Sequence, residues 1–163
     1  MTDCEEFYTA RGYEISAGEN ELTPSMEDYI EMIYRESLKT GYVRVSDLAV
    51  RLNVQPPSVS KMMAKLQEKS LLKYEKYGMI HLSEEGLKLG KFFLERHNTL
   101  KLFLKHLGVV INLQKDVEQM EHHISWETFT ALSSFVSFLQ KNEEVLQAFS
   151  RYKEEKQPKL KRP

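Results

Sequence analysis

The sequence predicts a mainly α-helical protein in which a winged helix-turn-helix domain is followed by an all-helical domain. Apolar residues recur at helical spacing through most of the 163 residues. Two short helical patterns are separated by a tight turn, and a segment of alternating character with a glycine follows them directly. Helix, turn, helix and hairpin in this order are the elements of a winged helix.

The first helix is expected over Met26–Lys39, with Ser25 or Thr23 as its N-cap and Gly41 at its end. Its apolar residues at helical spacing are Tyr29, Ile30, Ile33 and Tyr34. Residues 1–22, which precede it, show no period, and we interpret them as a flexible acidic arm.

A helix-turn-helix is predicted next. Val43–Val45 should be extended, and Ser46-Asp47 should cap a short helix over Leu48–Leu52. Asn53 suits the tight turn, and a second helix is expected over residues 56–69. The apolar side chains of its inner face are Val59, Met62, Met63 and Leu66.

Residues 72–82 alternate around Gly78, which predicts a two-stranded hairpin. Ser83 should then cap a long helix that runs to about His106 and ends before Gly108. Three more helices are expected at residues 113–124, 126–140 and 142–152.

The helix expected over residues 126–140 has a wider apolar stripe than a small monomeric domain needs. The stripe consists of Leu132, Phe135, Val136, Phe138 and Leu139. We therefore expect part of it to form a homodimer interface.

Composition excludes a membrane partner. Of all residues 41% are hydrophobic and 29% charged, and no apolar run approaches the ~20 residues that cross a bilayer. The N-terminus lacks the apolar core of a signal peptide, and Cys4 is the single cysteine. These features predict a cytoplasmic protein.

The net charge of −1 hides a local asymmetry. Residues 1–21 carry −5, whereas residues 151–163 carry +4. Further basic residues gather around the second helix of the helix-turn-helix and the hairpin: Lys61, Lys65, Lys69, Lys73 and Lys76. For DNA the location of the charge matters more than the total.

The second helix of a helix-turn-helix enters the major groove, and its first residues reach base edges. Here the residues expected near DNA are Gln55, Pro57, Ser58, Ser60, Lys61 and Lys65. Arg44 and Ser46 are expected at phosphate, and Lys76 and Tyr77 at the hairpin tip should reach the adjacent backbone. The alternative is a helical pair in a bundle with a solvated lysine face; the hairpin and the basic bias favour DNA.

Acidic residues and histidines at helical spacing indicate a metal site. Two carboxylates and an imidazole share one face of a predicted helix at i, i+3 and i+4: Glu118, Glu121 and His122. Asp28 and Glu31 have the same i, i+3 spacing on the first helix, and His97 lies on the long helix. From the residues alone, surface charge remains the alternative, since acidic side chains are normally exposed.

The donor set is rich in oxygen. Four carboxylates and two imidazoles without a thiolate suit manganese or ferrous iron, and two divalent cations would balance the charge of −4. A dinuclear metallohydrolase is the rival class. However, the chain lacks the spacings Glu-x-x-His, typical of di-iron bundles, and His-Glu-x-x-His, so no enzyme activity is predicted. His123 faces away from Glu118 and is not expected to be a ligand.

Several segments together resemble the manganese transport regulators, a branch of the diphtheria-toxin-repressor family. They are Thr23–Glu31, Val45–Ala49, Tyr74–Tyr77 and Val117–His123. The resemblance extends from about Thr23 to Gln140 and reproduces several ligand spacings at once.

The resemblance implies a homodimeric cytoplasmic repressor of manganese-uptake genes that binds double-stranded operator DNA and no small organic substrate. It implies a binuclear Mn²⁺ site made of Asp28, Glu31, His97, Glu118, Glu121 and His122. In the iron-responsive branch a methionine and a cysteine replace Asp28 and Glu118. Oxygen ligands there favour manganese, with Fe²⁺, Co²⁺, Cd²⁺ or Zn²⁺ as substitutes.

The expected organisation has four parts. They are a flexible acidic arm at 1–22, a winged helix-turn-helix DNA-binding domain at 23–92, a helical metal-binding and dimerisation domain at 93–152, and a disordered basic tail at 153–163. Metal bound between the domains would fix the pose of two recognition helices for a palindromic operator. A metal-independent winged-helix regulator remains the main alternative, and a dinuclear metallohydrolase the lesser one.

Overall fold

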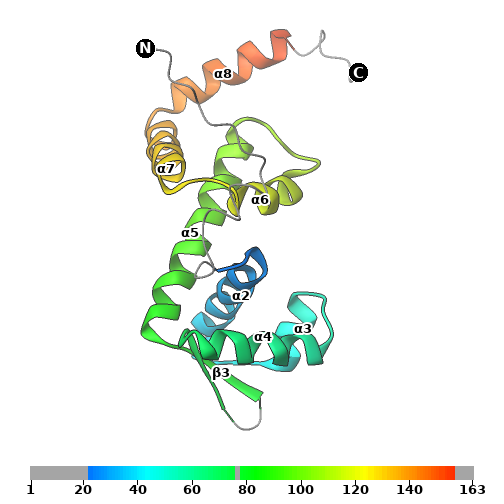
Figure 1. Cartoon of the computed structure of the whole chain (residues 1–163). Coiled ribbons are helices and arrows are strands. Elements are labelled where there is room, and N and C mark those ends of the chain that lie inside the picture. The colour runs from blue at the N-terminus through cyan, green and yellow to red at the C-terminus, as the bar shows by residue number, and fades with distance from the viewer. Residues whose placement is uncertain (1–21, 76–77, 157–163) are drawn as a thin grey trace, which may run out of the picture.

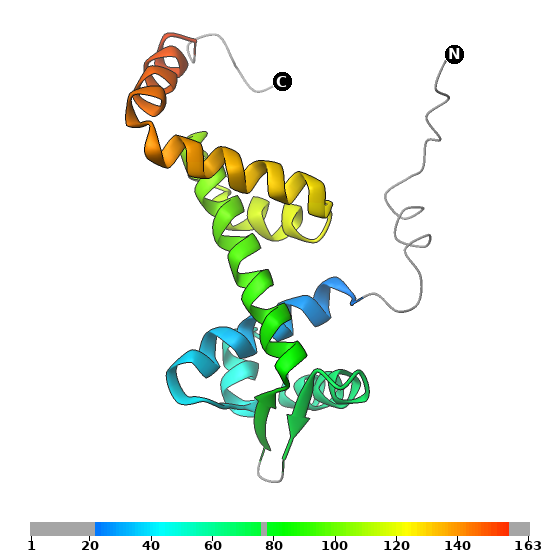
Figure 2. The same ribbon diagram turned by 90° about the vertical axis from the view of Figure 1, so that its left-hand side faces the viewer.

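A computed structural model describes residues 22–75 and 78–156 and confirms the mainly helical fold. The winged-helix elements lie at one end, α5 leads away from them, and α6, α7 and α8 lie at its far end (Figures 1 and 2). The elements in order are α2 (Pro24–Thr40), β1 (Val43–Arg44), α3 (Val45–Arg51), α4 (Pro56–Glu68), β2 (Leu72–Tyr74), β3 (Met79–Leu82), α5 (Glu84–His106), α6 (Leu113–Glu121), α7 (Trp126–Lys141) and α8 (Glu143–Lys156).

Helix α2 begins and ends as its sequence predicts. The Thr23 hydroxyl accepts a hydrogen bond from the Met26 amide at 3.3 Å, so Thr23 rather than Ser25 is the N-cap. Gly41 ends the helix in the left-handed conformation, with φ 77°. Leu22, assigned from sequence to the arm, packs against the core; residues 1–21 lie outside the described residues.

The predicted cap of α3 is wrong. Arg44 holds the N-cap position without a side-chain cap bond, and Ser46 and Asp47 lie inside the first turn. The reason is that β1 pairs with β3, which keeps Arg44 extended and lets the helix begin at Val45. The turn after α3 uses Asn53 at φ 53°, as expected.

The hairpin is part of a three-stranded antiparallel sheet with the order β1-β3-β2. The hairpin itself was predicted, whereas the pairing of β1 along its other edge was not. Ile80 lies opposite Val43 on one side and Tyr74 on the other, and it is fully buried. Leu72 and Ile80 belong to the same buried core as the apolar residues of α2 and α4, so the sheet anchors the hairpin to that core.

Helices α2 and α5 pack closely. A Cβ at Gly90 would lie 2.5 Å from the Cβ of Tyr34, so only glycine allows this approach. The close contact places Glu27 and Glu31 of α2 beside Arg96 and His97 in the middle of α5.

The C-terminal helices differ from the prediction by more than one residue at two ends. Ser83 caps α5 as expected, accepting from the Gly86 amide at 3.1 Å. Helix α6 ends at Glu121, three residues early. Helix α8 continues to Lys156, so residues 153–156 are helical and not part of a disordered tail; residues 157–163 lie outside the described residues.

Only part of the apolar stripe of α7 is buried within the chain. Val136 and Leu139 are buried within the chain, whereas Phe135 and Phe138 are about half exposed. The outward half remains available for a second copy of the chain, in line with the expected dimer interface. Within the described residues, no helix has the length and apolarity that a membrane crossing requires.

Candidate metal centre

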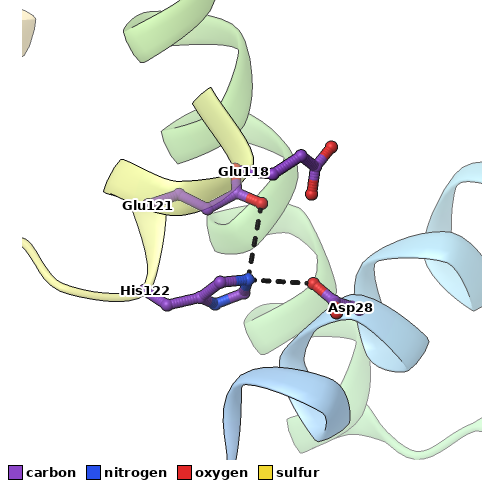
Figure 3. A group of neighbouring side chains, drawn as sticks. All are labelled: Asp28, Glu118, Glu121 and His122. Carbon is purple, nitrogen blue, oxygen red and sulfur yellow. Dashed lines mark ion pairs between the residues drawn. The ribbon is translucent and has the colours of Figure 1, made fainter. Parts of the chain in front are cut away.

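Side chains from three helices meet between the winged-helix elements and the C-terminal helices. Ligand-type atoms of one group lie within 4.8 Å of one another: Asp28, Glu118, Glu121 and His122 (Figure 3). A second group satisfies the same limit: Glu31, His97 and Glu121. The structure thus brings together all six residues singled out in the sequence, and Glu121 belongs to both groups.

Helical spacing accounts for each half of the cluster. Asp28 and Glu31 are separated by one turn of α2 and share its face toward α5 and α6. His122 is the C-cap of α6, but its φ of −84° and ψ of −10° continue the helical course. The i, i+4 relation to Glu118 therefore survives the early end of the helix.

Burial differs sharply across the cluster. Glu121 is 1% exposed and His97 2%, whereas the side chain of Glu118 is 46% exposed. A pocket of about 330 Å³ opens onto the cluster and is lined in part by Asp28, Glu31, His97 and Glu118. One side of the centre is therefore deep, and the other can be reached from solvent.

The hydrogen bonds within the cluster leave one carboxylate oxygen of Glu121 without a partner. His97 Nδ1 lies 2.9 Å from Glu121 Oε2, and His122 Nε2 lies 3.0 Å from Asp28 Oδ1. Glu121 Oε1 is buried and has no hydrogen-bond partner. Because an unpaired buried carboxylate oxygen is costly, this atom and the surrounding oxygen and imidazole donors fit a divalent cation.

The charges perturb one another. Burial raises the pKa of Glu121, although the hydrogen bond from His97 opposes the shift. Burial also raises the pKa of Glu31, against the effect of Arg35, whose Nε donates to Glu31 Oε1 at 2.9 Å. Perturbed carboxyl groups gathered beside an open pocket are typical of a functional site rather than a solvated helix face.

Hydrogen bonds to Asp28 and Glu27 raise the pKa of His122 to about 10. In the metal-free protein this imidazole is therefore protonated at neutral pH. The imidazolium partly balances the carboxylates around it.

Sequence reasoning missed two residues of this region, Glu27 and Arg96. Glu27 Oε2 lies 2.8 Å from His122 Nδ1 and 2.6 Å from Arg96 Nη2. A signal was present, since Arg96 occupies a buried position in the apolar face of α5. A buried arginine requires an acidic partner, so the sequence could have been searched for a carboxylate that pairs with Arg96.

The remaining histidines lie outside both groups. His123 is exposed, as its helical position predicted. His81 lies in β3 beside the Tyr42 ring, with a centroid distance of 6.1 Å. His106 lies in the last turn of α5.

Most residues predicted to contact DNA lie at the start or in the first turns of α4, whereas Arg44 and Ser46 lie where β1 passes into α3. Ser60 is half-buried. The other described ones are exposed: Arg44, Ser46, Gln55, Pro57, Ser58, Lys61 and Lys65. Of the expected inner face, Val59, Met63 and Leu66 are buried and Met62 is partly so. Lys76 and Tyr77 lie outside the described residues.

Comparison with known proteins covers both halves of the chain. Residues 21–80 match the family described as "Iron dependent repressor, N-terminal DNA binding domain". Residues 83–149 match "Iron dependent repressor, metal binding and dimerisation domain".

Individual relatives belong to the same class of regulators as the matching family. The HTH-type transcriptional regulator MntR of Geobacillus kaustophilus is 45% identical over 127 residues, which are 77% of this chain and 90% of the relative. The manganese regulator SloR has a TM-score of 0.62 and 27% identity, and ScaR with bound Zn²⁺ has 0.58 and 30%. The matches cover 72% and 69% of this chain but only 55% and 54% of those two chains.

These matches exclude the metallohydrolase alternative, because the family consists of transcription regulators and not of enzymes. They also agree with the winged helix and with a metal-binding and dimerisation domain after it. The chain belongs to the iron-dependent repressor family of metal-responsive, DNA-binding transcription regulators.

Proposed function

We propose that the chain is a manganese-activated homodimeric repressor of manganese-uptake genes that binds a palindromic operator in the cytoplasm. One observation carries the proposal: five ligand-type side chains from α2, α5 and α6 with its C-cap converge on a sixth, the buried Glu121. The names of the relative MntR and of the manganese regulator SloR support the choice of metal.

The two groups of side chains suit two cations. We assign Asp28, Glu118, Glu121 and His122 to one cation and Glu31, His97 and Glu121 to the other, with Glu121 shared. Divalent ions held by these residues would supply positive charge to the four carboxylates. No sulfur ligand is present in either group, which favours hard Mn²⁺, with Fe²⁺, Co²⁺, Cd²⁺ or Zn²⁺ as substitutes.

The position of the site explains how metal would control DNA binding. Helix α2 belongs to the proposed DNA-binding domain at 23–92, and α6 belongs to the proposed metal-binding and dimerisation domain at 93–152. Ligands held on both sides restrict the relative motion of these domains and fix the separation of two recognition helices in a dimer. Metal then selects a pose that the free protein already samples, and by reciprocity DNA tightens metal binding equally.

At the DNA, the exposed start of α4 reads the major groove. We assign base-edge or nearby contacts to Gln55, Pro57, Ser58, Ser60, Lys61 and Lys65. Arg44 and Ser46 contact phosphate, as do Lys76 and Tyr77 of the wing.

The deciding experiment compares DNA binding with and without Mn²⁺. Duplexes selected from a random pool in the presence of Mn²⁺ are titrated in gel shifts with Mn²⁺ or with chelator. We expect binding to be roughly 10- to 100-fold tighter with Mn²⁺, the usual size of such coupling. Equal binding in chelator would favour the metal-independent regulator instead.

Mn²⁺ binding should weaken as the pH falls. With a pKa of about 10, His122 holds an extra proton throughout the neutral range, and a metal ligand must be neutral, so binding releases a proton. Between about pH 6.5 and 8 the apparent Kd for Mn²⁺ should rise up to about tenfold for each unit of acidification. Calorimetry in two buffers with different protonation enthalpies measures the proton release. A pH-independent Kd without proton release would contradict this prediction.

A further inference from the structure

Glu27 lies in neither ligand group, yet it contacts one of the proposed ligands. Its Oε2 is 2.8 Å from Nδ1 of His122, and its side chain is only 18% exposed. The other ring nitrogen, Nε2, lies 3.0 Å from Asp28 Oδ1 and 3.8 Å from Glu121 Oε1. The two ring nitrogens point in different directions, so Nδ1 faces Glu27 while Nε2 faces Asp28 and Glu121 (Figure 3 shows Nε2 toward Asp28 and Glu121).

Arg96 holds Glu27 in place. Arg96 Nη2 lies 2.6 Å from the same Oε2, and the residue is 7% exposed. Its guanidinium carbon packs over the rings of Phe92 and Phe93, at 5.6 and 5.0 Å from their centroids. A charge-assisted hydrogen bond in a buried, aromatic setting restricts the carboxylate to one position.

The single oxygen Oε2 therefore connects three helices. Glu27 lies on α2, Arg96 on α5, and His122 caps α6. These are the helices that supply the proposed ligands. The contact spans the junction at which the metal is expected to act.

We propose that Glu27, held by Arg96, is a positioning residue that orients the His122 ring so that Nε2 faces the cation. The inference rests on the proposed function. The contact between Nδ1 and Glu27 does not involve Nε2, so the orientation exists before metal arrives. Carboxylates that accept from the second nitrogen of a metal-bound histidine typically affect metal affinity by about 10- to 100-fold.

The test compares Glu27→Ala, Glu27→Gln and the matched control Glu36→Ala in the full-length protein. Glu36 is also on α2, is also paired with an arginine, Arg51, and is similarly shielded at 20% exposure, but it lies in neither ligand group. Two quantities are measured: the Kd for Mn²⁺ by calorimetry, and the ring-nitrogen NMR signals of His122 in metal-free protein, assigned with a His122→Gln variant.

We expect Glu27→Ala to weaken Mn²⁺ binding about 10- to 100-fold and to shift the His122 ring signals. Glu27→Gln should lie between it and the parent, because the amide oxygen still accepts a hydrogen bond but without charge. Glu36→Ala should stay within about twofold of the parent on both measures.

Two results would overturn the inference. One is parental Mn²⁺ affinity in Glu27→Ala; the other is an equal loss in Glu36→Ala, which would indicate a general effect on α2. If Glu27→Ala fails to fold, unchanged His122 signals in Glu27→Gln overturn it as well. Failure of the proposed function looks different, since the unmodified protein would then not bind Mn²⁺ at all.

Discussion

Replacing Glu121 with alanine is expected to abolish Mn²⁺-dependent DNA binding and to leave a folded dimer. Glu121 is the residue common to both groups of ligand-type side chains, so its loss disrupts both proposed cation sites. Its Oε1 has no hydrogen-bond partner in the described structure, so the polar contact that the metal-free protein loses is the one between Glu121 Oε2 and His97 Nδ1. Gel shifts with Mn²⁺ measure DNA binding, calorimetry measures Mn²⁺ binding, and gel filtration shows whether the dimer is retained.

Two companion variants make this result specific. Glu121→Gln keeps the volume of the buried side chain and removes its charge, so it should also lose Mn²⁺ activation without creating a cavity. His123→Ala changes an exposed residue two positions further on and should behave like the parent. Activation that survives in Glu121→Gln would remove this carboxylate from the proposed site.

Lys61→Ala should weaken DNA binding and flatten its salt dependence. Lys61 is exposed in the second turn of α4, on the surface opposite the buried Val59 and Met63. A lysine that neutralises one phosphate contributes close to one unit to the slope of log K against log salt. The slope should therefore become shallower by about one unit, and by about two in a Lys61→Ala, Lys65→Ala double variant. Gel-shift titrations at several salt concentrations with saturating Mn²⁺ measure the slope.

A lysine at the other end of the molecule serves as the control. Lys141→Ala removes an equal charge from the exposed end of α7 and should leave the slope unchanged. Equal slopes for Lys61→Ala and the parent would mean that α4 does not lie against the DNA backbone.

Local rules explain why so many elements could be predicted from the sequence. Side-chain caps at Thr23 and Ser83, and left-handed positions at Gly41 and Asn53, act over a few residues and are visible in any sequence. The prediction of the α3 cap failed because contact with a segment distant in the sequence changed the local structure. Pairing of β1 with β3 moved the start of α3 to Val45, which no local pattern at Ser46 could indicate.

The sequence by itself determined the kinds of ligand and their spacing within each helix. Asp28 and Glu31 share a face because a helix repeats every 3.6 residues, whatever its surroundings. The same holds for Glu118 and His122. These periodicities singled out Asp28 and Glu31 on one helix and Glu118, Glu121 and His122 on another, whereas His97 has no such spacing to them.

Tertiary structure alone decided how those faces meet. It assigned Glu121 to both groups, buried it while leaving Glu118 half exposed, and set Glu27 between Arg96 and His122. The physical reason is that the placement of α2, α5 and α6 depends on contacts between residues far apart in the chain, such as the close approach at Gly90, and periodicity within a helix carries no information about them.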